Sequence, residues 1–401
     1  MKLSKITPLF KAGSESDPSN FRPVSVLPAL SKVFEKIMLD QLSLHFNKNK
    51  LLHNKQYGFT KGRSTIDAGV KLISDIFNAW EESYDGVGVF CDLSKAFDCV
   101  HPDILVGKLQ HYGVDGKASS LMNSYLKGRI QRVHVNGVTS PGSQVSMGVP
   151  QGSILGPFLF LIYINDLPFF VNEVHEMVLF ADDTSLLFKV NRNNVLLDDV
   201  NNSISRIVNW FNVNNLLLNE NKTKCIRFTT TSVKRDIGNL KIKDSELNFV
   251  DKTVFLGITI DSKLQWGPHI ETLSNRLSSA AYAVKKIRQF TDEDTAKIVY
   301  HSYFHSVMSY GILLWVLLQR FNPYLCCRSG LFGVFVVFLR GSRLQKINHS
   351  LYGNCIRFYN KLPSEIRELS LNKFKALVKR KLINKAFYKF EDYLNDPNPW
   401  D

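Results

Sequence analysis

Three aspartates stand where strongly apolar stretches end, and no other feature constrains the fold of this chain more. Asp92 follows GVGVFC, a run that predicts a buried strand over 86–91. Asp182 and Asp183 stand side by side between the apolar runs EMVLF and TSLLFK, which predict a hairpin over 176–189. Carboxylates that gather near a core repel one another and raise the free energy of the fold unless cations neutralise them.

A pair of divalent ions would remove that repulsion. Mg²⁺ prefers carboxylate oxygens together with substrate phosphates. Two such ions about 3.5–4 Å apart can activate an attacking 3′-hydroxyl and stabilise a leaving pyrophosphate. An isolated Asp-Asp pair more often forms a solvated turn. The apolar strands on both sides of the turn at 181–183, and the matching strand-end Asp92, favour the metal site.

Hydrophobic periodicity predicts a chain that mixes helices with short strands. Asn136-Gly137 is a strong turn signal and predicts a hairpin over 129–147. Ser64 or Thr65 can cap a helix over 66–82. An almost wholly apolar run predicts a buried helix over 156–167. Further helices are predicted over 29–46, 102–112, 198–215, 267–289 and 292–315, and further strands near 225–230 and 254–260.

Charge and composition narrow the classes of function. Lys plus Arg exceed Asp plus Glu by 50 − 36 = 14, which suits a polyanionic partner such as nucleic acid, although a basic protein without such a partner is the alternative. The six cysteines form no CxxC pattern, so we expect reduced thiols in an intracellular protein rather than zinc or disulfides. No signal peptide is visible, and the apolar runs 311–318 and 331–339 are too short to span a membrane.

Around the three carboxylates the sequence resembles reverse transcriptases. FCDLSKAFD (90–98), GVPQGSILGPFLFLIYINDL (148–167) and LFADDTSLL (179–187) are similar to three consecutive motifs of that family, as found in LINE-type, jockey-like non-LTR retrotransposons. SNFRPVSVLPALSKVFEKIM (19–38) and QYGFTKGRST (56–65) resemble its finger motifs, and LLLNENKTKCIRF (216–228) and FLGITID (255–261) its later palm motifs. The seven motifs follow the family's order, and the resemblance covers about residues 3–315.

The resemblance implies a catalytic role for four residues. Asp92, Asp182 and Asp183 match the carboxylates that bind two Mg²⁺ ions, with Mn²⁺ as the alternative metal. Lys222 of NKTK matches a lysine proposed as general acid toward pyrophosphate, whereas the alternative is a surface lysine. For Asp98 we expect a structural role, because a helix N-terminus favours a carboxylate.

Three residues match positions beside the incoming nucleotide. Phe97 matches the bulky residue that blocks a ribose 2′-hydroxyl and selects dNTPs, with an ordinary core aromatic as the alternative. Gln151 of PQGS matches a residue beside the nucleotide, and Gly152 would allow close approach of the backbone. A plain turn is the alternative for this motif.

Basic residues of the finger motifs match contacts to phosphates. Arg22 of NFRPVS would bind the triphosphate, since a guanidinium fits that anion with paired donors, and Lys11 is a further candidate. Lys61 and Arg63 either contact the template backbone or are solvated.

The resemblance implies an α+β right-hand polymerase with a small antiparallel palm sheet and a helical C-terminal part. Fingers and palm would occupy 1–261 and a helical thumb 262–315. Residues 316–341 resemble nothing in the family and are expected to be atypical. Family-like residues resume at 342–401, where 371–390 predicts a basic amphipathic helix with seven basic residues and no acidic one.

The expected activity is RNA-directed DNA polymerisation by a non-LTR retrotransposon protein. Its partners would be an RNA template, a DNA primer or target, and dNTPs, with no membrane. The endonuclease of the family is expected to be absent from this chain. The alternatives are a catalytically silent remnant that at most binds nucleic acid, and an RNA-templated host polymerase such as a telomerase. We expect an intracellular protein, either in the nucleus or in a cytoplasmic ribonucleoprotein.

Overall fold

The computed structural model describes residues 2–170, 175–192, 197–230, 240–242, 245–312 and 314–315, together with Pro363 and Leu377. The chain divides into two compact units, Met1–Phe321 and Asn322–Asp401. The expectations for 316–341 and for the basic helix at 371–390 lie outside the described residues, apart from Leu377.

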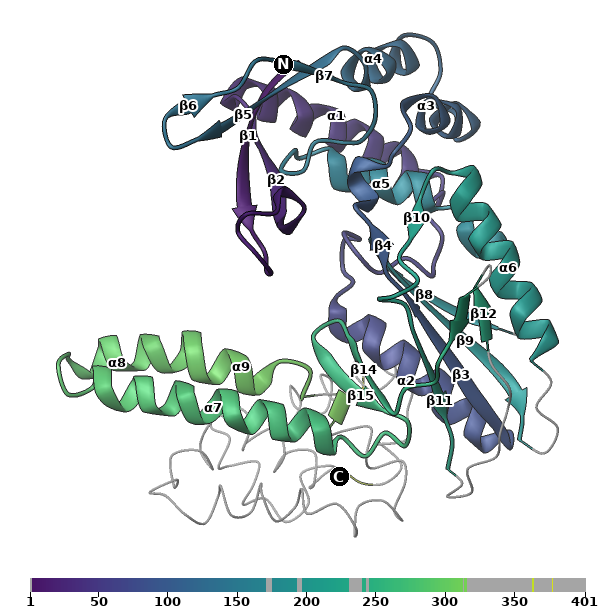
Figure 1. Cartoon of the computed structure of the whole chain (residues 1–401), viewed down its shortest axis with the longest axis vertical. Helices are drawn as coiled ribbons and strands as arrows, with labels where there is room; N and C mark the ends of the chain where they lie inside the picture. Colours follow the sequence, from purple (N-terminus) through teal and green to yellow (C-terminus); the bar gives the residue numbers. More distant parts are fainter. Residues whose placement is uncertain are drawn as a thin grey trace. The chain divides into compact units, whose positions relative to one another are not determined.

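A four-stranded antiparallel sheet forms the centre of the first unit (Figure 1). Its strand order is β11 (Lys224–Phe228), β3 (Tyr84–Cys91), β9 (Asp183–Asn191) and β8 (Glu176–Phe180). β3 is buried at every position after Tyr84, as a strand covered on both faces should be. This sheet confirms the predicted α+β class and the strands predicted at 86–91 and 176–189.

Helices cover the central sheet. α2 (Thr65–Glu81) packs against β3, β8 and β9, and it begins at Ser64 in a capping box with Asp67. The predicted buried helix is α5 (Gly156–Ile164), which shares one core with the inward-facing valines of β3 and with α6 (Asp198–Val213).

A second sheet is built from the N-terminal strands and a later hairpin. β1 (Leu3–Phe10) pairs antiparallel with β2 (Phe21–Val26) and parallel with β5 (Arg129–Val135). β5 then pairs with β6 (Val138–Thr139) and β7 (Ser143–Val145). Asn136 and Gly137 both have positive φ, 50° and 83°, as the predicted Asn-Gly turn requires.

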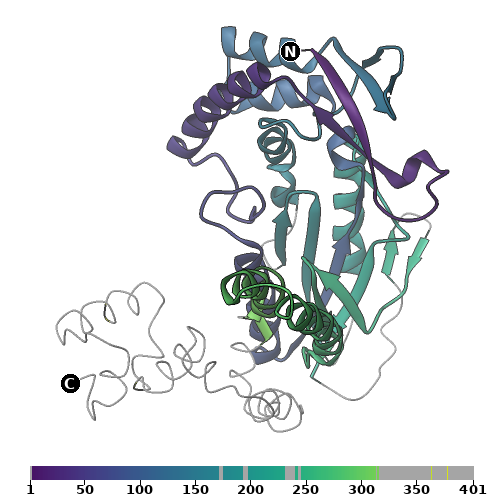
Figure 2. The ribbon, with the colours of Figure 1, turned by 90° about the vertical axis from the view of Figure 1, so that its left-hand side faces the viewer.

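Three further helices accompany this sheet (Figures 1 and 2): α1 (Ala29–Lys48), α3 (Pro102–His111) and α4 (Gly116–Leu126). α1 and α3 agree with the sequence-based prediction. α4 was not predicted, because its sequence GKASSLMNSYL begins with glycine and carries three serines, which favour a helix less than alanine does. Burial of Met122, Tyr125 and Leu126 supplies the stabilisation that the local sequence lacks.

The C-terminal part departs from the prediction at one strand. The single strand predicted over 254–260 is wrong, because the chain reverses at Leu256 and Gly257, whose φ angles are 46° and 81°. The result is a hairpin of β14 (Lys252–Phe255) and β15 (Ile258–Asp261). The other short pairs are β10 (Leu217–Leu218) with β4 (Leu93–Ser94), and β12 (Leu240–Ile242) with β13 (Ser245–Leu247).

The chain after this hairpin is helical, as predicted. α7 (Gly267–Ile287) packs alongside a second helical stretch (Figure 2). That stretch is not one regular helix: α8 (Glu293–Val299) and α9 (Ser306–Ser309) flank a π-helical segment, Tyr300–His305. None of the helices among the described residues is long and apolar enough to span a bilayer.

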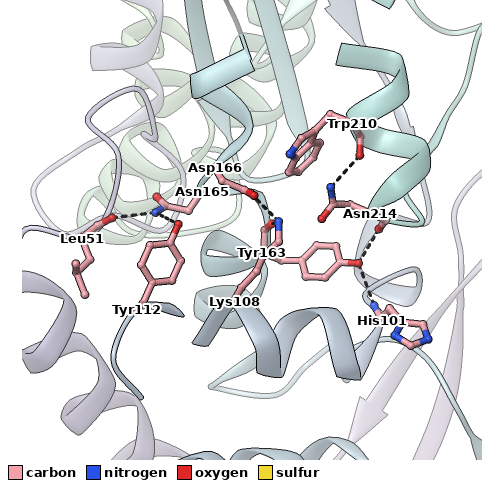
Figure 3. Close-up of polar contacts among 9 residues, drawn as sticks. All are labelled: Leu51, His101, Lys108, Tyr112, Tyr163, Asn165, Asp166, Trp210 and Asn214. Carbon is pink, nitrogen blue, oxygen red and sulfur yellow. Dashed lines mark hydrogen bonds and ion pairs between the residues drawn. The ribbon is translucent and has the colours of Figure 1, made fainter. Parts of the chain in front are cut away.

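A polar network anchors the end of α5 (Figure 3). Lys108 of α3 donates to the Tyr163 carbonyl at 2.6 Å and to Asp166 Oδ1 at 2.7 Å, and lies 4.7 Å from the centre of the Trp210 ring. Burial lowers the pKa of Lys108, although Asp166 opposes that shift. The lysine therefore joins α3, the segment after α5 and α6.

Neighbouring polar groups extend this network to other segments. Asn165 Nδ2 donates to the Leu51 carbonyl at 2.9 Å and to the Tyr112 hydroxyl at 2.8 Å (Figure 3). The Tyr163 hydroxyl donates to the Asn214 carbonyl at 2.6 Å. These bonds satisfy buried polar groups and fix α5, whose N-terminal end follows the PQGS loop.

Candidate active site

The central sheet brings the three predicted carboxylates to one place. Asp92 directly follows β3, and the pairing of Cys91 with Thr184 puts it beside the start of β9. Phe180 pairs with Asp183, so Ala181 and Asp182 form a two-residue turn. Asp183 is therefore the first residue of β9 and not part of the turn, in contrast to the predicted connection over 181–183.

The electrostatics of the three carboxylates are coupled. Desolvation, together with the negative charges of Asp182 and Asp92, raises the pKa of Asp183 to about 6. Burial and the charge of Asp92 also raise the pKa of Asp182, while the positive charges of Arg22 and Lys11 oppose that shift. The site thus concentrates negative charge and has two basic residues within electrostatic range.

These residues fit divalent metal ions. None of the ion pairs among the described residues includes Asp92, Asp182 or Asp183, so the repulsion between them is not offset by a direct salt bridge there. Within the same described part, no group of three or more His, Cys, Asp or Glu side chains is arranged so that it could hold a metal ion by itself, so waters and substrate phosphates would have to supply further ligands. An open set of carboxylates suits Mg²⁺, which usually keeps waters and binds substrate phosphates as well.

A turn after β10 clamps the backbone of Asp92. Asn219 N–H donates to the Asp92 carbonyl at 2.8 Å, and Asp92 N–H donates to Thr223 Oγ1 at 3.4 Å. The Thr223 hydroxyl in turn donates to the Asn219 carbonyl at 2.8 Å. Lys222 is exposed on this same turn and directly precedes Thr223, which binds the backbone of Asp92. Neither Asn219 nor Thr223 was predicted as a site residue, although both stand in the motif NENKTK (219–224).

The PQGS loop lies against β2. Ser25 N–H donates to the Gln151 carbonyl at 2.7 Å. Gly152 has a φ of 105°, and a Cβ there would lie 2.8 Å from the Ser25 carbonyl oxygen, so the position requires glycine. The close approach that the structure shows at Gly152 is to β2, and an approach to substrate at this residue stays a prediction.

Lys11 and Arg22 stand near one end of the β1–β2 hairpin. Lys11 follows β1, and its N–H donates to the Asn20 carbonyl at 2.9 Å. Arg22 lies on β2 opposite Leu9. Because both charges act on Asp182, the structure places them toward the carboxylates.

The LSKAFD segment meets the PQGS loop through side chains. Gln151 Nε2 lies 2.9 Å from both carboxylate oxygens of Asp98. Phe97, half-buried, stacks on Phe160 of α5 with ring centroids 4.7 Å apart. Asp98 lies in the one-turn 3-10 helix Ala96–Asp98, four residues before α3 begins, and its carboxylate accepts a hydrogen bond from Gln151, so it links these two segments and does not cap α3.

The two template-contact candidates differ in their surroundings. Lys61 is exposed. The Arg63 guanidinium lies 4.7 Å from the centre of the Tyr57 ring and donates to the carbonyls of Asn54 and Gln56. Arg63 therefore stabilises its own loop, and contact with a template stays a prediction for both residues.

Comparisons with known proteins show which family the chain matches. A family model described as reverse transcriptase (RNA-dependent DNA polymerase) matches residues 11–260. A probable RNA-directed DNA polymerase from transposon BS of Drosophila melanogaster is 28% identical over 337 residues, which cover 80% of this chain and 36% of the relative. The RNA-directed DNA polymerase from mobile element jockey of the same species is 28% identical over 280 residues, 68% of this chain and 30% of the relative.

The chain thus spans about a third of the length of these curated relatives. Among solved structures, telomerase from Candida tropicalis in complex with a fragment of telomeric RNA aligns with a TM-score of 0.48 and 11% identity. That alignment covers 80% of this chain and 55% of the telomerase chain.

Proposed function

The chain belongs to the reverse transcriptase (RNA-dependent DNA polymerase) family, and from this premise we propose that it extends a DNA primer along an RNA template as the polymerase of a LINE-type non-LTR retrotransposon. The observation that carries the proposal is the convergence of Asp92, Asp182 and Asp183 at adjoining strand ends, where the charge of Asp92 raises the pKa of both Asp182 and Asp183. Such a cluster costs free energy unless cations bind it.

The proposed metal site uses these three residues. Asp92, Asp182 and Asp183 would hold two Mg²⁺ ions, which, when bound, activate the primer 3′-hydroxyl and stabilise the leaving pyrophosphate. Arg22 and Lys11 would bind and orient the triphosphate of a dNTP, since both already act electrostatically on Asp182. Lys222 would give a proton from its ammonium to the departing pyrophosphate.

The proposed nucleotide pocket lies between the LSKAFD and PQGS segments. Gln151, fixed by Asp98, would contact the incoming nucleotide, and Gly152 would let the backbone approach it. Phe97, fixed by its stack on Phe160, would exclude a ribose 2′-hydroxyl. Holding the nucleotide and primer in a reactive geometry would supply much of the rate enhancement.

We further assign fingers and palm to 1–261 and a helical thumb to 262–315. The pairing of β1 and β2 with β5, the central sheet and the helices α7 to α9 support this division. Lys61 and Arg63 are proposed at the template side because they share a loop with Gln56, which pairs with β8.

Primer extension by the full chain, with an RNA template, dNTPs and Mg²⁺, tests the proposal. We expect extension by the wild-type chain and none by the double variant Asp182→Ala/Asp183→Ala. Asp40→Ala is the matched control, because among the described residues Asp40 forms an exposed ion pair with Lys36 and no other. Retained nucleic-acid binding without any extension by the wild-type chain would instead identify a catalytically silent remnant.

A further inference from the structure

A segment that precedes α2 runs along β8, the strand that leads into the turn of Ala181 and Asp182. Leu179 N–H donates to the Lys55 carbonyl at 2.9 Å, and Tyr57 N–H donates to the Leu179 carbonyl at 2.8 Å. Gln56 is thereby bridged to Leu179 in parallel orientation. Residues 55–57 thus extend the sheet beside β8, and they place the Gln56 side chain within reach of the turn.

The Gln56 side chain binds the turn itself. It is 2% exposed, and its Oε1 accepts hydrogen bonds from Gly58 N–H at 2.8 Å and from Ala181 N–H at 3.3 Å. Ala181 has a φ of 56°, a left-handed conformation that residues other than glycine adopt at a cost. The amide of Gln56 therefore stabilises a strained residue immediately before Asp182.

The backbone at Gly58 gives independent evidence that this contact is close. A Cβ on Gly58 would lie 2.4 Å from the Ala181 nitrogen and 2.8 Å from the Phe180 carbonyl carbon. The QYGF loop (56–59) and the turn of Ala181 and Asp182 thus pack backbone against backbone. No larger residue fits at position 58 without moving the turn.

The two ends of the Gln56 amide differ in their hydrogen bonding. Among the described residues, Nε2 is buried without a hydrogen-bond partner. A buried donor without a hydrogen-bond partner lowers the stability of the fold, so a glutamine is not kept at this position for the sake of its Nε2. The two hydrogen bonds that Oε1 accepts from Gly58 and Ala181 are therefore the polar contacts that hold this side chain in place among the described residues.

We propose that Gln56 is a positioning residue that sets the geometry of Asp182 and Asp183 for divalent metal binding. The inference rests on the proposed function, since it concerns the same metal site. Gln56 contacts neither metal nor substrate and acts through the Ala181 N–H. Groups that orient metal ligands typically change metal affinity by about 10- to 100-fold when they are removed.

Mn²⁺ binding, followed by electron paramagnetic resonance on the full chain, tests the inference directly. Gln56→Met keeps the length of the side chain and removes the carbonyl acceptor, so we expect Mn²⁺ affinity to fall roughly 10-fold or more. Gln56→Glu keeps an acceptor oxygen and should retain most of the affinity. Gln110→Met is the matched control, because Gln110 is exposed on α3 and its amide binds only Ser119 among the described residues.

Primer extension adds a second readout. Gln56→Met should raise the Mg²⁺ concentration for half-maximal extension about as much as it weakens Mn²⁺ binding. The KM for dNTP at saturating Mg²⁺ should stay near the wild-type value, whereas a general loss of structure would change both.

The outcomes separate the two proposals. Unchanged Mn²⁺ affinity in Gln56→Met, with an active wild-type chain, would overturn the role of Gln56 alone. A wild-type chain that neither binds Mn²⁺ nor extends a primer would overturn the proposed function. If Gln56→Met does not fold, Gln56→Asn replaces it, because the shorter side chain withdraws the carbonyl from Ala181. If neither variant folds, Gln56 is a structural residue and the inference is overturned.

Discussion

The side-chain nitrogen of Gln151, Nε2, lies 2.9 Å from each of the two carboxylate oxygens of Asp98. Burial raises the pKa of Asp98, and the hydrogen bond from Gln151 opposes that shift, so the amide stabilises the ionised carboxylate. In return the carboxylate fixes the orientation of the amide. The pair joins two segments that sequence analysis had associated only through their separate motifs.

Removal of Asp98 should therefore impair nucleotide binding through Gln151. Hydrogen bonds to charged groups contribute about 1.5–3 kcal/mol, so Asp98→Ala should raise the KM for dNTP roughly tenfold or more. Steady-state extension at varied dNTP and saturating Mg²⁺ measures this. Asp103→Ala is the control, because Asp103 makes an exposed ion pair with Lys127. An unchanged KM in Asp98→Ala would show that Gln151 does not need this partner.

Substitution of Phe97 should relax sugar selection. Phe97→Val opens space beside the proposed ribose site and removes the stack on Phe160, at a cost of about 2 kcal/mol in unfolding free energy. We expect the ratio of rNTP to dNTP incorporation to rise roughly tenfold, because discrimination against a hydroxyl here depends on excluded volume. Competition between the two nucleotides on one primer measures the ratio, with Phe290→Val, at an 83% exposed position, as control. The same ratio in Phe97→Val and wild type would show that Phe97 does not exclude the ribose 2′-hydroxyl.

Local signals in the sequence predicted much of the fold. The Asn136-Gly137 turn, the helix that begins at Ser64 and the strand that ends at Asp92 all depend on residues within a few positions of one another. The carboxylates at 182 and 183 were found because charge between apolar strands is costly wherever the strands pack. Periodicity and turn chemistry carry this information without tertiary contacts.

The partners of the site residues could not be predicted in the same way. The contact of Gln56 with Ala181 joins residues 125 apart in the sequence, and that of Asp92 with Thr223 joins residues 131 apart. No periodicity relates such segments, because only the completed sheet brings them together. The hairpin at Leu256 escaped prediction for a local reason, since a leucine at positive φ is uncommon.

A methyl group at position 58 should disturb the active site more than its size suggests. In Gly58→Ala the new Cβ meets the backbone of Ala181 at 2.4 Å, and neither chain can yield by rotating a side chain. We expect extension to fall at least about 100-fold, since displacement of reacting groups by about 1 Å can cost that much. Gly107→Ala is the matched control, because nothing lies within 4 Å of its Cβ in α3 and alanine favours the helix. Equal activity in the two variants would show that the turn tolerates movement.

Binding of Mg²⁺ should stabilise the fold more at about pH 7.5 than at about pH 5. The metal-free folded chain holds the pKa of Asp183 at about 6, above its ordinary value of 3.8. A carboxyl group whose pKa is raised by folding makes the fold less stable as the pH rises from about 4, and the loss is complete above about 6. Metal binding needs the ionised form and removes the repulsion from Asp182 and Asp92.

Melting temperatures of the wild-type chain, with and without Mg²⁺ at constant ionic strength, measure this effect at the two pH values. Comparing the two metal states at each pH cancels the titration of histidines elsewhere in the chain. Asp183→Asn should lose most of the pH dependence of the Mg²⁺ effect, because the asparagine does not titrate. It should also melt at a higher temperature than wild type in metal-free buffer near pH 7.5, where the repulsion is greatest. An equal Mg²⁺ effect at both pH values in the wild type would contradict a metal site that includes Asp183.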